Sequence, residues 1–258
     1  MKSLFFILSL CAIALNLQCS RKESHPAEAH AIPSQAVTLP TLSVPHTAET
    51  ISLDGHLNEA SWKHAARTLP FVNTMQGTPA MPHAISRWLW DDQFLYIAYE
   101  VNDRFLKSTY RNQDDHLWEQ DAVELMFDPG GDGKNYYELQ VSPTGNTFDT
   151  QYDSRRQPRP FGHTSWSSEV KVGVSTQGHV NDGSSDRGYT VEMAIPWSAF
   201  DLAHGMLATM PFRANMFILD AKKEGGQQAC GWSAPLLPDF HIPERFGHIT
   251  FKPRAHTP

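Results

Sequence analysis

The chain has 258 residues, of which 40% are hydrophobic, and its formal net charge at pH 7 is -7. A chain of this size and composition can bury a substantial core, and one β domain of about 200 residues fits it better than two small ones. The acidic balance gives no support to nucleic-acid binding, and the chain carries no basic patch or nucleic-acid motif. We therefore expect no nucleic-acid partner.

Residues 1–19 have the pattern of an export signal. Lys2 precedes an apolar run from Leu4 to Leu17, which is too short and too close to the start for a membrane-spanning helix. Cys19 follows the run at the position where bacterial lipoprotein signals carry their lipidated cysteine. Gln18 is larger than the residue usual there, so cleavage by an ordinary signal peptidase is the alternative. We expect an exported cell-envelope lipoprotein, periplasmic or anchored in the outer membrane, that contacts the membrane through a lipid on Cys19.

Residues 20–48 are polar and rich in Pro, Ala, His and Ser. This composition, with little hydrophobic periodicity, is typical of a tether. Apolar residues alternate around Pro40 to Pro45. An edge strand that starts the domain is therefore an alternative interpretation of this short stretch. The folded domain is expected over 49–254. Cys230 is then its single cysteine, which makes an internal disulfide impossible.

The folded domain shows mainly the alternating pattern of β-strands. One short helix is expected over 58–66, with Asn58 as its N-cap and Trp62 packed inward, and another over 197–202. Between turn signals, strands are expected at 85–90, 95–101, 122–127, 136–142, 170–174, 189–195, 212–219 and 246–251. The predicted fold class is therefore all-β, an antiparallel β-sandwich with short peripheral helices.

The hairpin between His116 and Thr150 carries a candidate binding face. Each strand has one apolar and one mixed face, and a Gly-rich turn around Asp132 joins them. Closure at this turn sets Glu124 opposite Gln140, both turned away from the core, with Trp118 just upstream. An aromatic plate beside a carboxylate and an amide can hold a polyhydroxylated ring. A polar surface pair on a half-solvated sheet is the alternative.

Several short motifs occur along the domain in a fixed order: Leu53-Asp54-Gly55-x-Leu57-x-Glu59-x-x-Trp62, Leu95-Tyr96-Ile97 with Val101-Asn102-Asp103, Trp118-Glu119-x-Asp121-Ala122-Val123-Glu124, Gly188-Tyr189-x-Val191-Glu192-x-Ala194-Ile195-Pro196-Trp197 and Phe246-Gly247. Each motif is weak alone. Together they resemble the family 9 carbohydrate-binding modules and their DOMON-type relatives over about residues 51–252. The resemblance implies a β-sandwich that binds sugars in a slot between two aromatic rings, often with structural calcium.

The resemblance also assigns individual residues. Trp118 corresponds to the family's first sandwiching aromatic residue and Glu124 to its sugar-binding carboxylate, in agreement with the hairpin. Phe240 takes the place of the family's second aromatic residue, a Trp. Gln140 replaces an Arg. Phe217 falls near another polar contact of the family, for which Asn215, two residues away, is a substitute, so the identity of the sugar is open. The implied function is non-catalytic binding of an oligosaccharide or polysaccharide, with a glycoside hydrolase as an expected partner.

A glycoside hydrolase is one alternative, because Glu119, Asp121 and Glu124 form a cluster of carboxylates in the sequence. Glycosidases use two carboxyl groups at a defined separation across the scissile bond. Asp121 and Glu124 are expected on opposite faces of one strand. Glu119 is therefore the remaining candidate partner of Glu124.

A haem-binding electron-transfer module is a second alternative, since some DOMON relatives bind haem through Met together with Lys or His. Met126 on the ligand-facing side and either Met193 or Met216 are candidate axial ligands. Methionine is also a common filler of hydrophobic cores, and that is the competing interpretation of all three.

Calcium is the metal that the resemblance implies. The turn that contains Asp128 and Asp132, together with Asp103, offers the hard oxygen ligands that Ca²⁺ takes. Aspartate is equally common in tight turns that hold no metal. The sequence therefore leaves both the presence of a metal and its ligands open.

Overall fold

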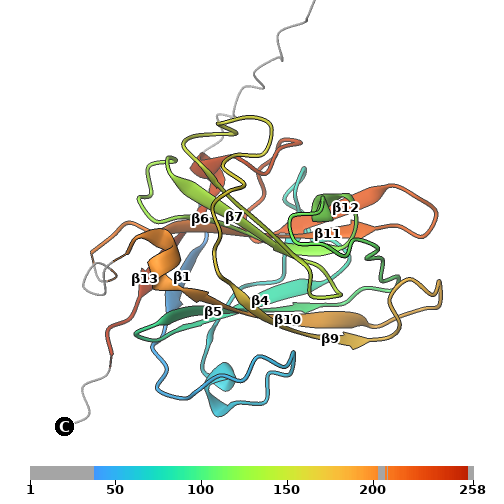
Figure 1. Ribbon diagram of the computed structural model, residues 1–258, viewed down its shortest axis with the longest axis horizontal. Coiled ribbons are helices and arrows are strands. Elements are labelled where there is room, and N and C mark those ends of the chain that lie inside the picture. The colour runs from blue at the N-terminus through green and yellow to red at the C-terminus, as the bar shows by residue number, and fades with distance from the viewer. Residues whose placement is uncertain (1–37, 203–206, 208, 255–258) are drawn as a thin grey trace, which may run out of the picture. The chain divides into compact units, whose positions relative to one another are not determined.

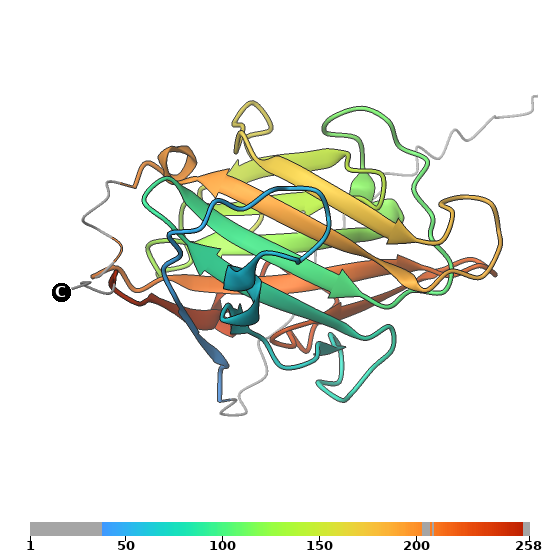
Figure 2. The same cartoon turned by 90° about the horizontal axis from the view of Figure 1, so that it is seen from below.

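The computed structural model of the protein describes residues 38–202, 207 and 209–254. These residues form two β-sheets that pack face to face (Figures 1 and 2). The larger sheet has the strand order β1-β13-β11-β6-β7-β8, with β12 and β3 added beside β11, and the smaller has the order β2-β4-β5-β10-β9. The predicted all-β sandwich is confirmed.

The strands of the larger sheet pair in antiparallel fashion, except at one edge. There β1 runs parallel to β13, with Thr41 opposite His248. The predicted edge strand between Pro40 and Pro45 is thus confirmed, and the sheet begins inside the stretch 20–48 that was expected as a tether. The strands are β1 (Thr41–Val44), β3 (Val72–Asn73), β6 (Ala122–Asp128), β7 (Tyr136–Val141), β8 (Thr147–Tyr152), β11 (Arg213–Ala221), β12 (Gln227–Gly231) and β13 (Gly247–Phe251).

The smaller sheet is antiparallel throughout and forms the lower layer in Figure 1. Its strands are β2 (Ala66–Arg67), β4 (Ala84–Trp90), β5 (Phe94–Val101), β9 (Lys171–Gln177) and β10 (Gly188–Pro196). The helices are short 3-10 turns at η1 (Ala60–Lys63), η2 (Leu117–Glu119), η3 (Trp197–Phe200) and η4 (Pro243–Arg245). Among the described residues, no helix has the length and hydrophobicity that a bilayer crossing requires.

The predicted cap of the first helix is wrong. The N-cap position of η1 is Glu59 rather than Asn58, and its side chain makes no capping bond. The carboxylate of Glu49 instead accepts hydrogen bonds from the backbone N–H groups of Ala60 and Ser61, so a residue distant in sequence satisfies the helix terminus. Trp62 is buried as predicted, and its indole N–H donates to the Glu192 carboxylate at 2.9 Å.

The core between the sheets follows from the alternation along each strand. Val123, Leu125 and Phe127 of β6 point inward and pack against residues of the smaller sheet. The opposite face of β6 carries Glu124, and the alternative interpretation of the hairpin placed it on a half-solvated surface. All residues of β6 and β7 instead have little contact with solvent. Arg156 and Phe161 from one loop and Phe240 from another line the pocket over this face.

Candidate functional site

A pocket of about 390 Å³ lies on the outer face of the larger sheet. Its floor comes from neighbouring strands, with Glu124 on β6 and Glu138 and Gln140 on β7. Glu124 stands directly opposite Gln140, so the predicted register of the hairpin is confirmed. The volume lies within the range of small-molecule sites in proteins.

Trp118, on η2, forms one aromatic wall of the pocket. The imidazole of His116 stacks on its ring with the centroids 4.4 Å apart. The Phe161 ring packs in a tilted arrangement with its centroid 5.0 Å from that of the indole, and the Phe148 ring packs in a T-shaped arrangement at a centroid distance of 5.1 Å. These three neighbours fix the orientation of the half-buried indole. A fixed orientation is what an aromatic side chain needs in order to stack against a ligand ring.

Phe240 forms a second aromatic wall. Its ring lies parallel to that of the fully buried Phe217, with the centroids 4.2 Å apart and an interplanar angle of 8°. Phe240 itself is half buried and lines the pocket together with Trp118. The two rings that the sequence placed on either side of a slot therefore do border one pocket.

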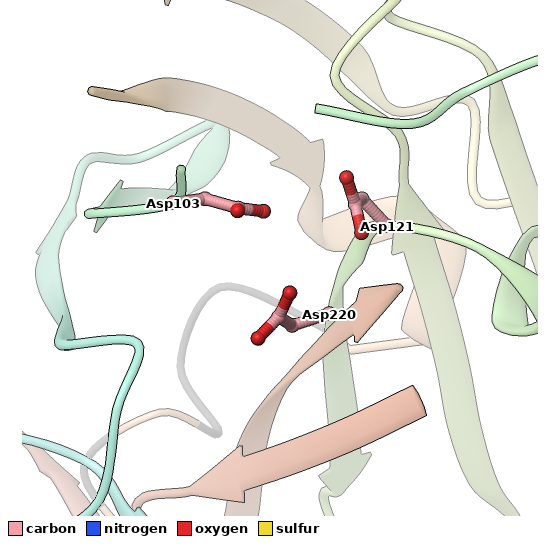
Figure 3. Close-up of side chains that lie close together, drawn as sticks. All are labelled: Asp103, Asp121 and Asp220. Carbon is pink, nitrogen blue, oxygen red and sulfur yellow. The ribbon is translucent and has the colours of Figure 1, made fainter. Parts of the chain in front are cut away.

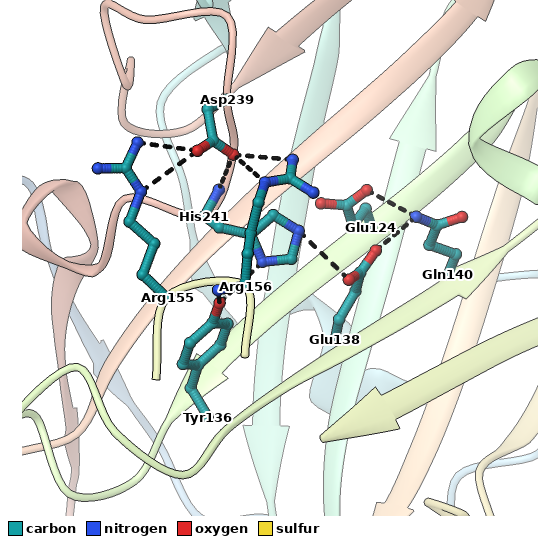
Figure 4. A network of polar contacts seen from close by, with 8 residues as sticks. All are labelled: Glu124, Tyr136, Glu138, Gln140, Arg155, Arg156, Asp239 and His241. Atoms are coloured by element: carbon teal, nitrogen blue, oxygen red, sulfur yellow. Dashed lines mark hydrogen bonds and ion pairs between the residues drawn. The ribbon is translucent and has the colours of Figure 1, made fainter. Parts of the chain in front are cut away.

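A chain of hydrogen bonds runs across the pocket floor (Figure 4). The side-chain amide of Gln140 donates to Glu124 Oε2 at 2.9 Å and to Glu138 Oε1 at 2.8 Å. Two acceptor atoms on this floor, Glu124 Oε1 and Gln140 Oε1, are buried without a hydrogen-bond partner. A buried polar atom without a partner costs about 1 to 3 kcal/mol, so these atoms call for a donor from a ligand or from water.

Burial disfavours the charged forms of the two glutamates on the pocket floor. Burial, and then the charge of Glu138, raise the pKa of Glu124 well above its usual range. Burial also raises the pKa of Glu138 to about 7, although hydrogen bonds from Tyr152 and Gln140 and the charge of Arg156 oppose the shift. At neutral pH the pair therefore carries less than two full negative charges.

His241 closes the buried end of this network. Its Nδ1 lies 2.8 Å from the Tyr136 hydroxyl, and its Nε2 lies 3.6 Å from Glu138 Oε2. Burial lowers the pKa of His241 to about 3, and the nearby charge of Arg156 acts in the same direction. The imidazole is therefore neutral at neutral pH and does not cancel the charge of Glu138.

Asp239 ties the loop that carries Phe240 to the turn after β8 (Figure 4). Arg155 Nη2 lies 2.9 Å from Asp239 Oδ2, and Arg156 Nη2 lies 2.8 Å from Asp239 Oδ1. Burial opposes ionisation of Asp239, but its hydrogen bonds to the two guanidinium groups outweigh burial and lower its pKa. This double ion pair positions both Phe240 and His241 over the sheet.

The structure does not bring Asn215 into the pocket. Asn215 is fully buried, its Nδ2 donates to the Ser233 carbonyl at 2.8 Å, and its Oδ1 accepts from the Ser233 N–H at 3.0 Å. It pairs with Met126, further along the ladder than the Phe217–Glu124 pair on the pocket floor. Its hydrogen-bonding groups are used by the backbone of Ser233, directly after β12. Asn215 is therefore not proposed to contact a ligand.

Several pocket residues are not among those that the sequence pattern indicated. Glu138 lies two residues before Gln140 and therefore on the same face of β7, so the period-two pattern of a strand was sufficient to identify it. The remainder lie on β8 or in loops, where local periodicity does not tell which surface they cover: Phe148, Tyr152, Arg156, Phe161, Asp239 and His241.

Apart from Glu124, the residues of the two alternative functions lie outside the pocket. Glu119 is exposed and pairs with the Tyr110 hydroxyl, and it does not line the pocket. Met126, Met193 and Met216 are all buried in hydrophobic clusters, and none of them lines the pocket either. All three methionines therefore act as core residues.

The turn at Asp128 uses its carboxylate for its own backbone. Asp128 Oδ1 accepts from the Gly131 N–H and Oδ2 from the Gly133 N–H, each at 2.8 Å. These bonds explain the Asp-Pro-Gly-Gly sequence without a metal. Asp132, the other candidate ligand of this turn, is exposed and accepts from the Lys134 N–H.

Asp103 lies in a different acidic cluster, with Asp121 and Asp220 (Figure 3). One carboxylate oxygen from each lies within 4.8 Å of the others, and all three side chains are buried. Burial and the charge of Asp103 raise the pKa of Asp121 to about 8. Asp103 Oδ2 has no hydrogen-bond partner. Buried, converging carboxylates with an unused oxygen fit Ca²⁺, which prefers oxygen ligands.

Comparison with known proteins shows what the chain is similar to. An exoglucanase, XynX, of Acetivibrio thermocellus is 30% identical over 167 residues, which are 64% of this chain but 13% of that enzyme. The chain thus spans about an eighth of the length of that curated relative.

Two solved structures share the fold. One is a protein of Bacteroides uniformis, provisionally described as carbohydrate-binding, with a TM-score of 0.68 and 22% identity, covering 83% of this chain and all of that one. The other is a family 9 carbohydrate-binding module of Caldicellulosiruptor kristjanssonii in complex with cellotriose, with a TM-score of 0.57 and 18% identity, covering 84% of this chain and 96% of that one. The carbohydrate family 9 binding domain-like family matches residues 53–254. The chain therefore belongs to this family of carbohydrate-binding domains.

Proposed function

We propose that the pocket binds one ring of an oligosaccharide or polysaccharide between Trp118 and Phe240, while Glu124 and Gln140 accept hydrogen bonds from its hydroxyl groups. The observation that carries the proposal is the pair of buried, unpartnered acceptors, Glu124 Oε1 and Gln140 Oε1, on the floor between two aromatic walls. Sugar C–H groups suit aromatic faces, and sugar hydroxyls supply the missing donors.

The charge around the pocket favours a neutral ring. Glu124, Glu138 and Asp239 line it together with a single guanidinium group, that of Arg156, which is paired with Asp239. A uronic acid would add a further negative charge beside buried carboxylates. Such a juxtaposition of like charges is unfavourable, so uronic acids are expected to bind more weakly than neutral sugars.

The floor also supports binding without turnover. Glu124 and Glu138 share one donor, the amide of Gln140, which therefore occupies the space between the two carboxylates. A glycosidase needs its two carboxyl groups free on either side of the scissile bond. A bridged pair of this kind can orient hydroxyl groups but is not placed to protonate a leaving group and attack the sugar.

The proposal is tested by titrating the full-length protein with cello-oligosaccharides and xylo-oligosaccharides in a calorimeter. Saturable binding is expected for at least one series, with no new reducing ends after prolonged incubation. Reducing ends that accumulate with time would show catalysis instead. Failure to bind any member of either series, or of a wider glycan array, would refute the assignment of the pocket.

We infer further that the protein acts at the cell envelope beside a glycoside hydrolase. The relatedness to a segment of a larger exoglucanase supports the enzyme partner. The apolar run followed by Cys19 supports export and lipid anchoring, although these residues lie outside the described part of the chain. Multiple acyl chains make such an anchor stable, whereas a single chain binds a membrane only marginally.

Cys19→Ser should release the protein from the membrane fraction into the soluble fraction of cells that express it. The change removes the thiol that would carry the lipid and leaves the described domain untouched. The measurement is fractionation followed by immunodetection, with Cys11→Ser as the matched control, because Cys11 lies inside the apolar run. Membrane association that persists in the Cys19→Ser variant would argue against lipidation.

A further inference from the structure

Glu138 lies beside Gln140 on the pocket floor, and its side chain is buried. Its Oε1 accepts a hydrogen bond from Gln140 Nε2 at 2.8 Å, and the Tyr152 hydroxyl donates a second hydrogen bond to the carboxylate. The unpartnered buried acceptors of the floor belong to Glu124 and Gln140 rather than to Glu138. The bonds of Glu138 are thus made to protein groups, and its influence on a ligand passes through Gln140.

The side-chain amide of Gln140 is held at its nitrogen end by two carboxylates (Figure 4). Its Nε2 donates to Glu124 Oε2 at 2.9 Å and to Glu138 Oε1 at 2.8 Å. An amide nitrogen carries two hydrogens, so these bonds use its whole capacity as a donor. At the other end of the amide, Oε1 is buried without a partner. In this orientation Gln140 can therefore accept a hydrogen bond from a ligand but cannot donate one.

The reversed orientation of the amide is unfavourable while Glu138 is ionised. Turning the amide over would place Oε1 against the carboxylates and Nε2 toward the pocket. An ionised carboxylate has no hydrogen to donate, so two acceptor oxygens would then meet without a proton between them. Glu124, Glu138 and Gln140 are all buried, and surroundings of low polarity make such a contact more costly. Glu138 therefore selects one of the two amide orientations.

We propose that Glu138 is a positioning residue of the sugar site, whose carboxylate holds the Gln140 amide with Oε1 toward the ligand. The ligand must then present a free hydroxyl that donates to this oxygen. A substituent that can only accept is disfavoured at the same ring position. This selectivity rests on the proposed function, whereas the orientation of the amide in the free protein does not.

Protonation of Glu138 is a second way to release the amide. Burial raises the pKa of Glu138 to about 7, so the carboxylate predominates at pH 8.5 and the acid at pH 5. The acid can donate to an amide oxygen, which removes the penalty for the reversed orientation.

The titratable groups that face Glu138 come from several elements: Glu124 on β6, Tyr136 on β7, Tyr152 on β8, Arg156 in the turn after β8, and Asp239 and His241 in the loop after β12. Burial raises the pKa of Glu124 as well, so acid acts on both glutamates in the same direction. Burial keeps the two tyrosines protonated and His241 neutral between pH 5 and pH 8.5. Arg156 and Asp239 stay charged in their ion pair.

The experiment titrates the full-length protein at pH 8.5 with glucose, xylose and their monodeoxy and monodeoxyfluoro derivatives. A deoxy position can neither donate nor accept, and a C–F group cannot donate but accepts weakly. Deoxygenation at the position over Gln140 is expected to weaken binding by about 2- to 10-fold in the wild type, and the fluoro derivative should lose as much. In Glu138→Gln the amide can turn its N–H groups toward the ligand, so the fluoro derivative should bind more tightly than the deoxy derivative.

The wild type at pH 5 should show the same difference between the two derivatives, which tests the proposal without a variant. The matched control is Glu192→Gln, the same change in a buried strand glutamate of the smaller sheet. It should lower the melting temperature, because Glu192 accepts from Trp62 and from the Gly55 N–H, and keep the two derivatives equal. Derivatives that remain equal in Glu138→Gln and at pH 5, or that differ in Glu192→Gln as well, would overturn the role of Glu138.

NMR of the side-chain amide protons tests the orientation in the free protein. Both Gln140 protons should resonate downfield of those of the exposed Gln76 at pH 8.5, because each donates to a carboxylate. Glu138→Gln should move at least one of them toward the position of Gln76. Wild-type Gln140 protons that already resonate with those of Gln76 would overturn the orientation. If no sugar binds while the Gln140 protons lie downfield, the sugar assignment fails and the orientation stands.

Discussion

Trp118→Ala is expected to weaken sugar binding by about 1 to 3 kcal/mol, the range for truncation of a central aromatic anchor at a binding site. The indole lines the pocket opposite the polar floor, and its orientation is fixed by His116, Phe148 and Phe161. Removing it deletes one wall of the slot and leaves the hydrogen-bonding groups in place. Calorimetric titration with the tightest-binding oligosaccharide measures the loss, which corresponds to roughly a 5- to 150-fold weaker affinity.

The melting temperature should change little in this variant, since Trp118 is half buried and lies outside the core between the sheets. Trp166→Ala is the matched control, because Trp166 is also a half-buried indole but packs against Tyr137 and does not line the pocket. That variant should lose stability and keep its affinity. The reverse pattern, with Trp118→Ala unfolding the domain while the folded fraction binds normally, would show that Trp118 is a structural residue.

The free energy of unfolding is expected to fall as the pH rises from about 4.5 to about 7, because of Glu138. In the unfolded chain this carboxyl loses its proton near its ordinary pKa of 4.5, whereas burial raises its pKa in the folded protein to about 7. Between these values the folded state binds more protons than the unfolded state, so raising the pH disfavours folding. The full shift corresponds to about 3 kcal/mol.

Glu138→Gln should remove this part of the pH dependence, because glutamine keeps the shape and an acceptor for Tyr152 but does not titrate. Denaturant unfolding at pH 5 and pH 7.5, in the presence of EDTA, measures the difference. Burial raises the pKa of Asp103 to about 6 and that of Asp121 to about 8, so part of the slope should persist in the variant. A slope identical to that of the wild type would show that Glu138 does not titrate in this window.

Glu49→Gln provides the control for this experiment. Hydrogen bonds from Ser61 lower the pKa of the exposed Glu49 carboxylate, so it titrates below the window between pH 4.5 and 7. The variant should therefore have the same pH dependence as the wild type in that window. If the free energy of unfolding depended less on pH in Glu49→Gln than in the wild type, the cause would be the loss of any acidic group rather than the burial of Glu138.

The sequence alone determined those features that depend on local alternation and on local turns. The apolar face of the 122–128 strand and the Gly-rich turn at Asp132 were enough to place Glu124 opposite Gln140, as the structure has them. The period of a strand is two whatever the rest of the fold does, so side-chain facing and hairpin register can be derived without tertiary contacts. The ordered motifs that resemble family 9 modules then placed Trp118 and Phe240 at one slot.

Only the tertiary structure decided which loops cover the Glu124 face of the larger sheet. It also decided that Asp103, Asp121 and Asp220 lie close together. Arg156 and Asp239 are 83 positions apart, and Asp121 holds the backbone of a residue 100 positions away. Such contacts arise because strand pairing and loop packing bring segments that are distant in the sequence side by side, and neither periodicity nor spacing specifies them. The burial of the Glu124 face, the raised pKa of Glu138 and the acidic cluster around Asp121 all follow from this long-range packing rather than from any local pattern.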